Sequence, residues 1–153
     1  MLAEGLQESA SLYLAGHSDG GDGLLDDMLS ENSNIKGYIL MGSFIKRTYY
    51  SLYTSSKKIL TIQGDLDGLV RVTRIAESFY HMVKSEDDLL KFPHIIVPGL
   101  SHLSFVSGEA PEAMKLKDLE AEVDEAQALE MIASIVSEFM HADVDLEAKE
   151  SLF

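Results

Sequence analysis

Hydrophobic and polar positions divide this chain into short apolar runs and longer amphipathic segments. The apolar runs that predict buried strands are residues 11–15, 35–41, 59–63 and 94–97. Apolar side chains recur at helical spacing in residues 20–32, 72–83 and, most strongly, 123–140. Strands and helices that alternate in this way predict an α/β fold, with about four parallel strands covered by helices on both faces.

The segments between these elements complete the expected organisation, a single domain over residues 1–153 without repeats or linkers. The connection at residues 42–58 is polar and aromatic and has room for one short helix. A long loop with Gly108 and Pro111 follows the last strand. The acidic tail at residues 142–153 is predicted to fray.

Composition narrows the classes of partner. The chain has 153 residues, 46% of them apolar, and a net charge of −14. This acidity argues against nucleic acid or an anionic membrane surface as a partner, because both would be repelled. No apolar run is long enough to span a membrane, and no secretory signal is visible, so the cytoplasm is the default expectation for a compartment the sequence leaves open. The absence of cysteine excludes disulfides and thiolate chemistry.

A glycine-flanked serine stands between the first predicted strand and the first predicted helix. Residues 16–20 read Gly-His-Ser-Asp-Gly and fit the pattern G-x-S-x-G in the strand-turn-helix context that the pattern requires. A serine on such a sharp turn is strained, and we expect Gly16 and Gly20 to remove side chains that would obstruct it. The amide of Asp19 would point at the same place from a helix N-terminus. A glycine-rich turn or a phosphate-binding loop also fits these residues.

Two further polar motifs follow later strands. Asp65 and Asp67 come after the third strand, and His102 follows the fourth. Taken singly, the carboxylates fit a helix cap or a turn, and the histidine fits an ordinary loop. Ser18, Asp67 and His102 are spaced by 49 and 35 residues, each after a separate predicted strand. Because parallel strands end at one edge of a sheet, the three side chains can converge there.

With these motifs the chain resembles the C-terminal half of an α/β-hydrolase, over about residues 12–140. GHSDGG would be the nucleophile elbow, GDLD the acid turn and GLSH the histidine loop. The resemblance implies that Ser18 is the nucleophile, His102 the base, Asp67 the acid that orients it, and the Asp19 amide an oxyanion-hole donor. Asp67 is preferred to Asp65 because family members usually carry the acid three residues after the glycine.

The implied reaction is hydrolysis of a small carboxylic ester through an acyl-enzyme, without a cofactor or metal. His17 is expected to pack beside the nucleophile. The histidines lack zinc-site spacing, and the acidic pairs at residues 26–27 and 87–88 are interpreted as solvated faces. Tyr49, Tyr50 and Tyr53 either line the substrate pocket or pack on a neighbouring helix. Residues 104–117 are expected to overhang the site.

One departure from the family shapes a competing hypothesis. Complete α/β-hydrolases place several strands before the elbow, whereas 17 residues precede Ser18. The chain would then be a partial or truncated domain that lacks a second oxyanion donor, whose loss costs about 10²–10³ in turnover. The first strand would become an edge, open to pairing with another chain. The alternative function is therefore a non-catalytic, α/β-hydrolase-like binding or interaction module.

Overall fold

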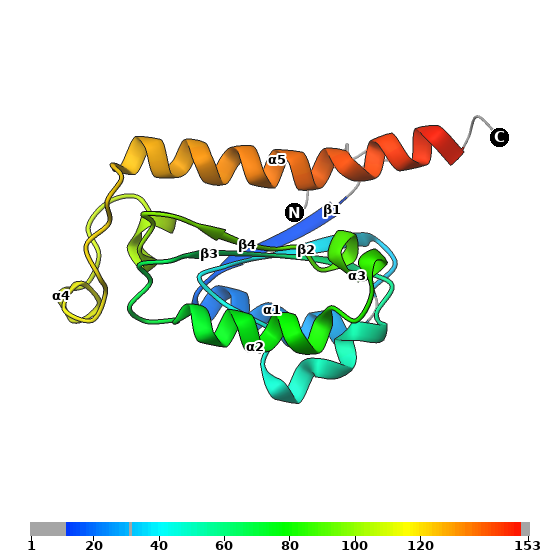
Figure 1. Cartoon of the computed structure of the whole chain (residues 1–153), viewed down its shortest axis with the longest axis horizontal. Coiled ribbons are helices and arrows are strands. Elements are labelled where there is room, and N and C mark those ends of the chain that lie inside the picture. Colours follow the sequence, from blue (N-terminus) through cyan, green and yellow to red (C-terminus); the bar gives the residue numbers. More distant parts are fainter. Residues whose placement is uncertain (1–11, 31, 151–153) are drawn as a thin grey trace, which may run out of the picture.

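The computed structural model of the chain describes residues 12–30 and 32–150, with side chains described to residue 142. Four strands form one sheet (Figure 1): β1 (Leu12–His17), β2 (Ile35–Met41), β3 (Lys58–Gly64) and β4 (His94–Val97). The α-helices are α1 (Asp19–Leu29), α2 (Val72–Met82), α3 (Glu86–Lys91), α4 (Glu112–Lys115) and α5 (Glu125–Glu150). Two 3₁₀ helices, η1 (Arg47–Thr54) and η2 (His102–Phe105), complete the order.

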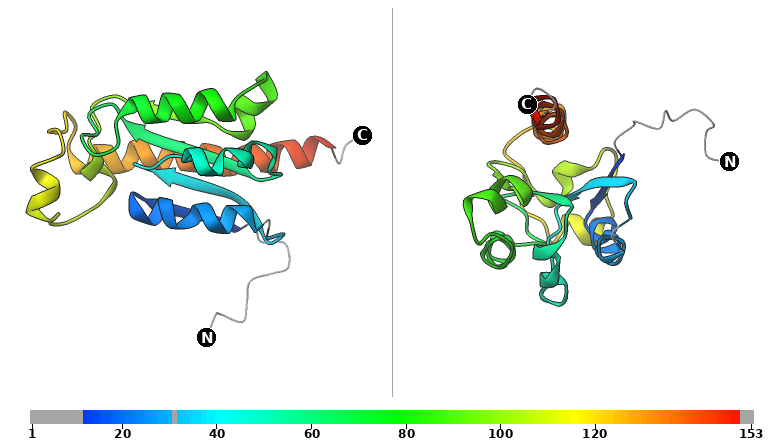
Figure 2. Two further views of the ribbon diagram at one scale, coloured as in Figure 1. Left: turned by 90° about the horizontal axis from the view of Figure 1, so that it is seen from below. Right: turned by 90° about the vertical axis from the view of Figure 1, so that its right-hand side faces the viewer.

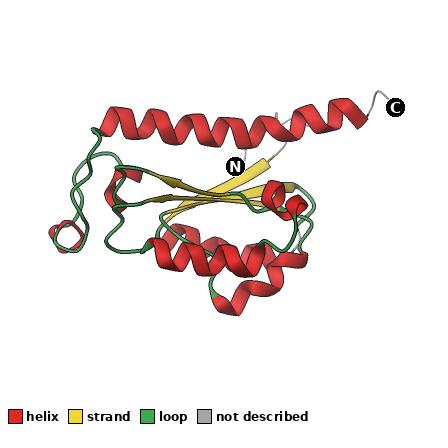
Figure 3. Ribbon diagram, in the orientation of Figure 1, coloured by secondary structure: helices red, strands yellow, loops and turns green. Residues whose placement is uncertain are grey.

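The sheet is parallel throughout and runs in the order β1-β2-β3-β4. Helices α1 and α2 lie on one face of it and α5 crosses the other, as the two further views in Figure 2 and the colours of Figure 3 show. This arrangement confirms the predicted α/β class, with a four-stranded parallel sheet covered on both faces. The carboxyl ends of all four strands share one edge, and the segments that follow them meet there.

Alternate side chains of each central strand pack on opposite faces, which is why these strands are apolar at nearly every position. In β2, Tyr38 and Leu40 are fully buried towards α1 and α2, while Ile39 packs in the cluster that includes α5. Burial of one such aliphatic side chain contributes about 1.5–3 kcal/mol. Ile132 and Phe139 of α5 close the second layer of the core.

Several boundaries differ from the predicted ones. β1 continues through His17 rather than ending at residue 15, and α1 ends at Leu29 instead of continuing to residue 32. Ser11, which was expected to open β1, lies outside the described residues. α5 continues to Glu150, past residue 142, where fraying was expected to begin. Six of residues 142–150 are alanine, leucine, glutamate or lysine, which favour helix independently of an apolar stripe.

The buried faces of two helices are also rotated from the predicted ones. α2 buries Ile75, Ser78 and Met82, whereas Phe79, expected in the core, is 40% exposed. In α5, Ala128 is buried and Leu129 is 39% exposed. None of the helices in residues 12–30 and 32–150 combines the length and the apolarity that crossing a lipid bilayer requires.

Two short helices were not predicted. α3 is capped at its N-terminus by Ser85. The Ser85 hydroxyl accepts a hydrogen bond from the Asp88 amide, and the Asp88 carboxylate accepts one from the Ser85 amide. This capping box is visible in the sequence as Ser-Glu-Asp-Asp, and it gives Asp88 a structural role beyond a solvated face. α4 interrupts the long loop after β4. The connection at residues 42–58 holds the single short helix, η1, that its length allows.

Candidate active site

Ser18 occupies a strained turn between β1 and α1. Its backbone has φ 53° and ψ −121°, and it is the one non-glycine residue with a positive φ in the described part of the chain. The Ser18 amide donates a hydrogen bond to the carbonyl of Met41 on β2 at 3.0 Å, and its carbonyl accepts one from Asp22 at 3.1 Å. The turn is therefore tied to the sheet on one side and to the helix on the other.

One of the two expected glycine roles is confirmed and the other is wrong. A Cβ on Gly16 would lie 2.5 Å from the backbone carbon and oxygen of Gly20, so the turn requires glycine there. A Cβ on Gly20 meets nothing within 4 Å, because that position faces open space. The second tight position is Gly21, where a Cβ would lie 2.7 Å from the Cβ of Ser43.

The structure brings Ser18, His102 and Asp67 together in one chain of hydrogen bonds. The Nε2 atom of His102 lies 2.9 Å from the Ser18 hydroxyl oxygen, and its Nδ1 atom lies 2.7 Å from Oδ2 of Asp67. His102 is fully buried and Asp67 is 4% exposed, whereas Ser18 is half-buried. A carboxylate accepts only, so Nδ1 carries the proton and Nε2 is free to accept one from the serine hydroxyl.

The two candidate carboxylates have separate contacts. Oδ1 of Asp67 accepts hydrogen bonds from the amides of Leu69 at 2.8 Å and Val70 at 2.6 Å, which leaves Oδ2 directed at His102. Oδ1 of Asp65 instead accepts the amide of Gly99 at 2.8 Å. Asp65 thus fixes the turn before the histidine, and Asp67 is the carboxylate that contacts the imidazole.

Gln63, the penultimate residue of β3, is a member of the site that sequence reasoning missed. Its Nε2 donates to Oδ2 of Asp67 and to the carbonyl of Val70, both at 2.6 Å. The Gln63 side chain is completely buried. Its signal in the sequence is one amide side chain near the end of an otherwise apolar run, immediately before the glycine that begins GDLD.

His17 packs against His102, in keeping with the expectation for it. Its ring lies 4.6 Å from that of His102 between centroids, and its Nε2 donates to the carbonyl of His102 at 3.0 Å. Burial and the neighbouring His102 hold the pKa of His17 below its ordinary value. His17 is therefore neutral at neutral pH and supports the segment that carries His102.

A cavity of about 350 Å³ opens beside Ser18. Its lining consists of His17, Ser18, Asp19, Leu103, Val106, Ser107, Glu109, Ala110, Pro111 and Met114. The loop expected to overhang the site therefore forms one wall of the cavity. The Asp19 amide, at the first residue of α1, has no hydrogen-bond partner in residues 12–30 and 32–150, and a helix N-terminus carries partial positive charge.

The three tyrosines of the connection at residues 42–58 do not line this cavity. The Tyr49 hydroxyl donates to Oδ1 of Asp26 at 2.6 Å, and the Tyr50 ring stacks on His81 with 4.2 Å between centroids. Tyr53 is half exposed. Tyr49 and Tyr50 thus pack against neighbouring helices, which is one of the two uses that the sequence left open. The acidic pair at residues 26–27 is not merely solvated, since the Tyr38 hydroxyl donates to Asp27 at 2.8 Å.

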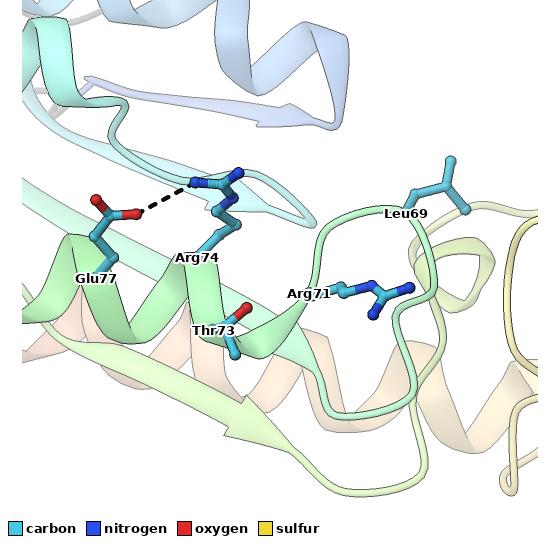
Figure 4. A pocket seen from close by; sticks show the side chains of 5 residues that line it. All are labelled: Leu69, Arg71, Thr73, Arg74 and Glu77. Carbon is cyan, nitrogen blue, oxygen red and sulfur yellow. Dashed lines mark hydrogen bonds and ion pairs between the residues drawn. The ribbon is translucent and has the colours of Figure 1, made fainter.

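A second cavity, of about 450 Å³, lies at the start of α2 (Figure 4). It is lined by Leu69, Arg71, Thr73, Arg74 and Glu77. Glu77 accepts from Arg74 at 3.4 Å and from Arg47 at 2.5 Å, so all three arginines of the chain gather on this side. No residue of the Ser18–His102–Asp67 chain contributes to this cavity, whereas Ser18 lines the first one.

Within the described ranges, no group of three or more His, Asp or Glu side chains is arranged to hold a metal ion. No model of a known protein family matches the chain, and no curated protein matches its sequence. The function of the site is therefore inferred from its geometry.

Proposed function

We propose that this protein is a serine hydrolase of the α/β-hydrolase superfamily that cleaves a carboxylic ester through an acyl-enzyme. The observation that carries the proposal is the hydrogen-bonded chain from Ser18 through His102 to Asp67, at 2.9 and 2.7 Å. A strained serine, a buried imidazole with its distal nitrogen free to accept, and a fully bonded carboxylate are the parts that nucleophilic acyl transfer requires.

In the first half of the reaction, the Ser18 oxygen attacks the ester carbonyl carbon while His102 takes the hydroxyl proton at Nε2. Asp67 holds the imidazole in position and stabilises the imidazolium that forms. The Asp19 amide donates a hydrogen bond to the developing oxyanion. Collapse of this intermediate breaks the ester C–O bond, and the alkoxide leaves as an alcohol with the proton from His102.

In the second half, water attacks the acyl-enzyme carbonyl and gives a proton to His102. The bond to Ser18 then breaks, and His102 returns the proton to the serine oxygen. The acid is released, and the enzyme is back in its starting state. No electrons are exchanged with a cofactor, and each proton that His102 accepts is returned in the same half-reaction.

The lining of the cavity at Ser18 supports a small substrate that is not anionic. Leu103, Val106 and Met114 offer apolar surface to an acyl chain or an alcohol. Glu109 lies in the same wall, and the chain as a whole carries a net charge of −14. Both disfavour a carboxylate or phosphate on the substrate, because like charges repel.

We extend the proposal to pairing through β1, which ends the described sheet on one side. A terminal strand in a parallel sheet can add a further strand from another chain or segment. Sedimentation velocity across a hundredfold range of concentration tests this. A mass that rises with concentration supports pairing between copies, and a monomer throughout rejects it.

The hydrolase proposal is tested by labelling the folded protein with a fluorophosphonate probe, which reacts with activated serines. We expect a single adduct on Ser18 that is absent from Ser18→Ala. Ser137→Ala, which changes an exposed serine on α5, serves as the matched control and retains the adduct. A folded wild-type protein that is not labelled would contradict the hydrolase and favour the non-catalytic binding module.

A further inference from the structure

Asp118, in the segment between α4 and α5, contacts both loops of the candidate site. Its Oδ1 accepts hydrogen bonds from the amide of Gly68 at 2.9 Å and from the amide of His102 at 3.1 Å. Its Oδ2 accepts the amide of Leu103 at 2.8 Å. Gly68 directly follows Asp67, so one carboxylate joins the residue next to the acid with the base itself.

We propose that Asp118 is a positioning residue, which clamps the loop carrying Asp67 onto the loop carrying His102 and so sets the geometry of their hydrogen bond. The inference rests on the proposed hydrolase function and adds a residue to it. Sequence reasoning did not find Asp118, which lies 16 residues beyond His102 and follows no predicted strand.

The charge of Asp118 suits this role. Burial raises the pKa of its carboxyl, but hydrogen bonds from the amides of Gly68, Leu103 and His102 outweigh burial and leave the pKa below its ordinary value. Asp118 is therefore ionised at neutral pH. Hydrogen bonds to an ionised acceptor are about twice as strong as those between neutral groups. The three contacts therefore strengthen a junction that two other hydrogen bonds also join, from the Leu66 amide to the carbonyl of Leu100 at 3.0 Å and from the Gly99 amide to Oδ1 of Asp65 at 2.8 Å.

Backbone packing at Gly68 is a second, independent observation. A Cβ at this position would lie 2.3 Å from the carbonyl oxygen of Lys117 and 2.8 Å from the Cα of Asp118. The Asp67 loop therefore touches the backbone of the Asp118 segment directly, and glycine permits that approach. The Asp118 carboxylate and the backbone of residues 117–118 therefore both contact Gly68, through different atoms.

The site depends on such a clamp because Asp67 and His102 come from loops after different strands. A displacement of a reacting group by about 1 Å can lower the rate up to 10²-fold, so a residue that fixes the position of such a group affects the rate. Asp67 is held within its own loop by the amides of Leu69 and Val70. Among the described contacts, Asp118 is the side chain that accepts amides from both loops at once.

Two variants disturb the clamp from opposite sides. Asp118→Asn keeps one oxygen acceptor but turns a donor towards the amide of Leu103 or towards those of Gly68 and His102. Gly68→Ala leaves the carboxylate intact and forces the two backbones apart. Asp88→Asn is the matched control, because Asp88 accepts the amides of Lys84 and Ser85, both at 2.9 Å, at the start of α3 and outside the site.

Proton NMR of the Nδ1 proton of His102 gives a readout that is independent of turnover. We expect a low-field resonance in the wild type and in Asp88→Asn, and its loss or broadening in Asp118→Asn and Gly68→Ala. With p-nitrophenyl acetate as the probe substrate, kcat falls by about 10- to 100-fold in these two variants while KM changes less than about twofold.

The outcomes separate this inference from the hydrolase proposal. A wild type with the low-field resonance but without turnover rejects the hydrolase, and the resonance in the variants still tests the clamp. If both variants retain the resonance and have the kcat of the wild type, the positioning role of Asp118 is rejected. If both fail to fold at 10 °C by circular dichroism, Asp118 supports the whole fold and the specific positioning role is likewise rejected.

Discussion

The Asp67 carboxylate shows how completely one side chain can be fixed by its neighbours. Two backbone amides bind Oδ1, and the imidazole of His102 and the amide of Gln63 bind Oδ2. A carboxylate with this many hydrogen bonds is held in one orientation, and its hydrogen bond to the imidazole then fixes the orientation of the imidazole as well. Gln63 is thus as much a part of the site as the residues that the motif names.

Replacing Gln63 tests this dependence. Gln63→Leu keeps the volume but removes the donor to Oδ2, and we expect kcat for an ester to fall about 10-fold, which corresponds to one charge-assisted hydrogen bond of about 1.5 kcal/mol. Thr61→Val is the control on the same face of β3. The Thr61 hydroxyl is buried without a partner in the described part of the chain, so its removal raises the free energy of unfolding by about 1 kcal/mol. Equal losses of kcat in both variants would contradict the role of Gln63.

At the scale of the element, the turn from β1 into α1 concentrates the local strain. Ser18 has a positive φ without being glycine, and Gly16 lies against the backbone of Gly20. The strain persists because the turn is bonded to β2 through the carbonyl of Met41. Neighbouring glycines therefore differ sharply in what they tolerate.

Alanine at these two glycines gives opposite results. We expect Gly16→Ala to lower the free energy of unfolding by about 2–3 kcal/mol, because its Cβ would overlap the Gly20 backbone. Gly20→Ala leaves it unchanged or raises it by up to about 1 kcal/mol, since its Cβ meets open space and alanine favours helix. Urea denaturation measures both. Similar destabilisation by the two variants would show that the turn is not packed as described.

Two kinds of feature could be predicted from the sequence: elements whose apolar residues recur at a regular spacing, and site residues that stand directly after a strand. Apolar runs located all four strands, and β2 and β4 were placed at their observed bounds. The convergence of Ser18 and His102 was predictable because parallel strands end at one edge. Asp118 and the rotated face of α2 were not, since a single carboxylate in a loop and the angle at which a helix docks depend on tertiary contacts that carry no periodic signal.

For the whole molecule, two partly buried histidines contribute to how stability depends on pH. Burial holds the pKa of His94 below its ordinary value, and burial with the adjacent His102 does the same for His17. The unfolded chain therefore binds more protons than the folded one as the pH falls below about 6.5. Stability present above that pH is lost progressively on acidification.

His94→Asn isolates one of these contributions. The amide of asparagine can replace the Nδ1 proton that His94 donates to the carbonyl of Phe92 at 2.7 Å, but it does not titrate. We expect the free energy of unfolding to fall less steeply between pH 6.5 and 5 than in the wild type, by at most about 1.4 kcal/mol per pH unit. Ser134→Ala, which removes no titratable group from an exposed site on α5, should leave the slope unchanged. An unaltered slope in His94→Asn would refute the assignment.

The charge of the molecule also predicts a substrate preference. p-Nitrophenyl butyrate and p-nitrophenyl hemisuccinate have acyl chains of the same length, but the second carries a carboxylate. We expect a lower kcat/KM for the hemisuccinate, with a gap that narrows in 1 M salt, where the Debye length falls to about 3 Å. Glu109→Gln should narrow the difference in kcat/KM between the two esters at low salt, because Glu109 lines the cavity at Ser18. Equal kcat/KM values for the two esters at low salt would contradict the charge argument.

The segment that carries Asp118 lies outside the sheet, between a four-residue helix and the start of α5. Its bonds to the site are few compared with those that join the strands. Gentle heating will therefore detach it while the layers beneath remain intact. The thermal midpoint of inactivation should consequently precede the midpoint at which the sheet and its helices melt.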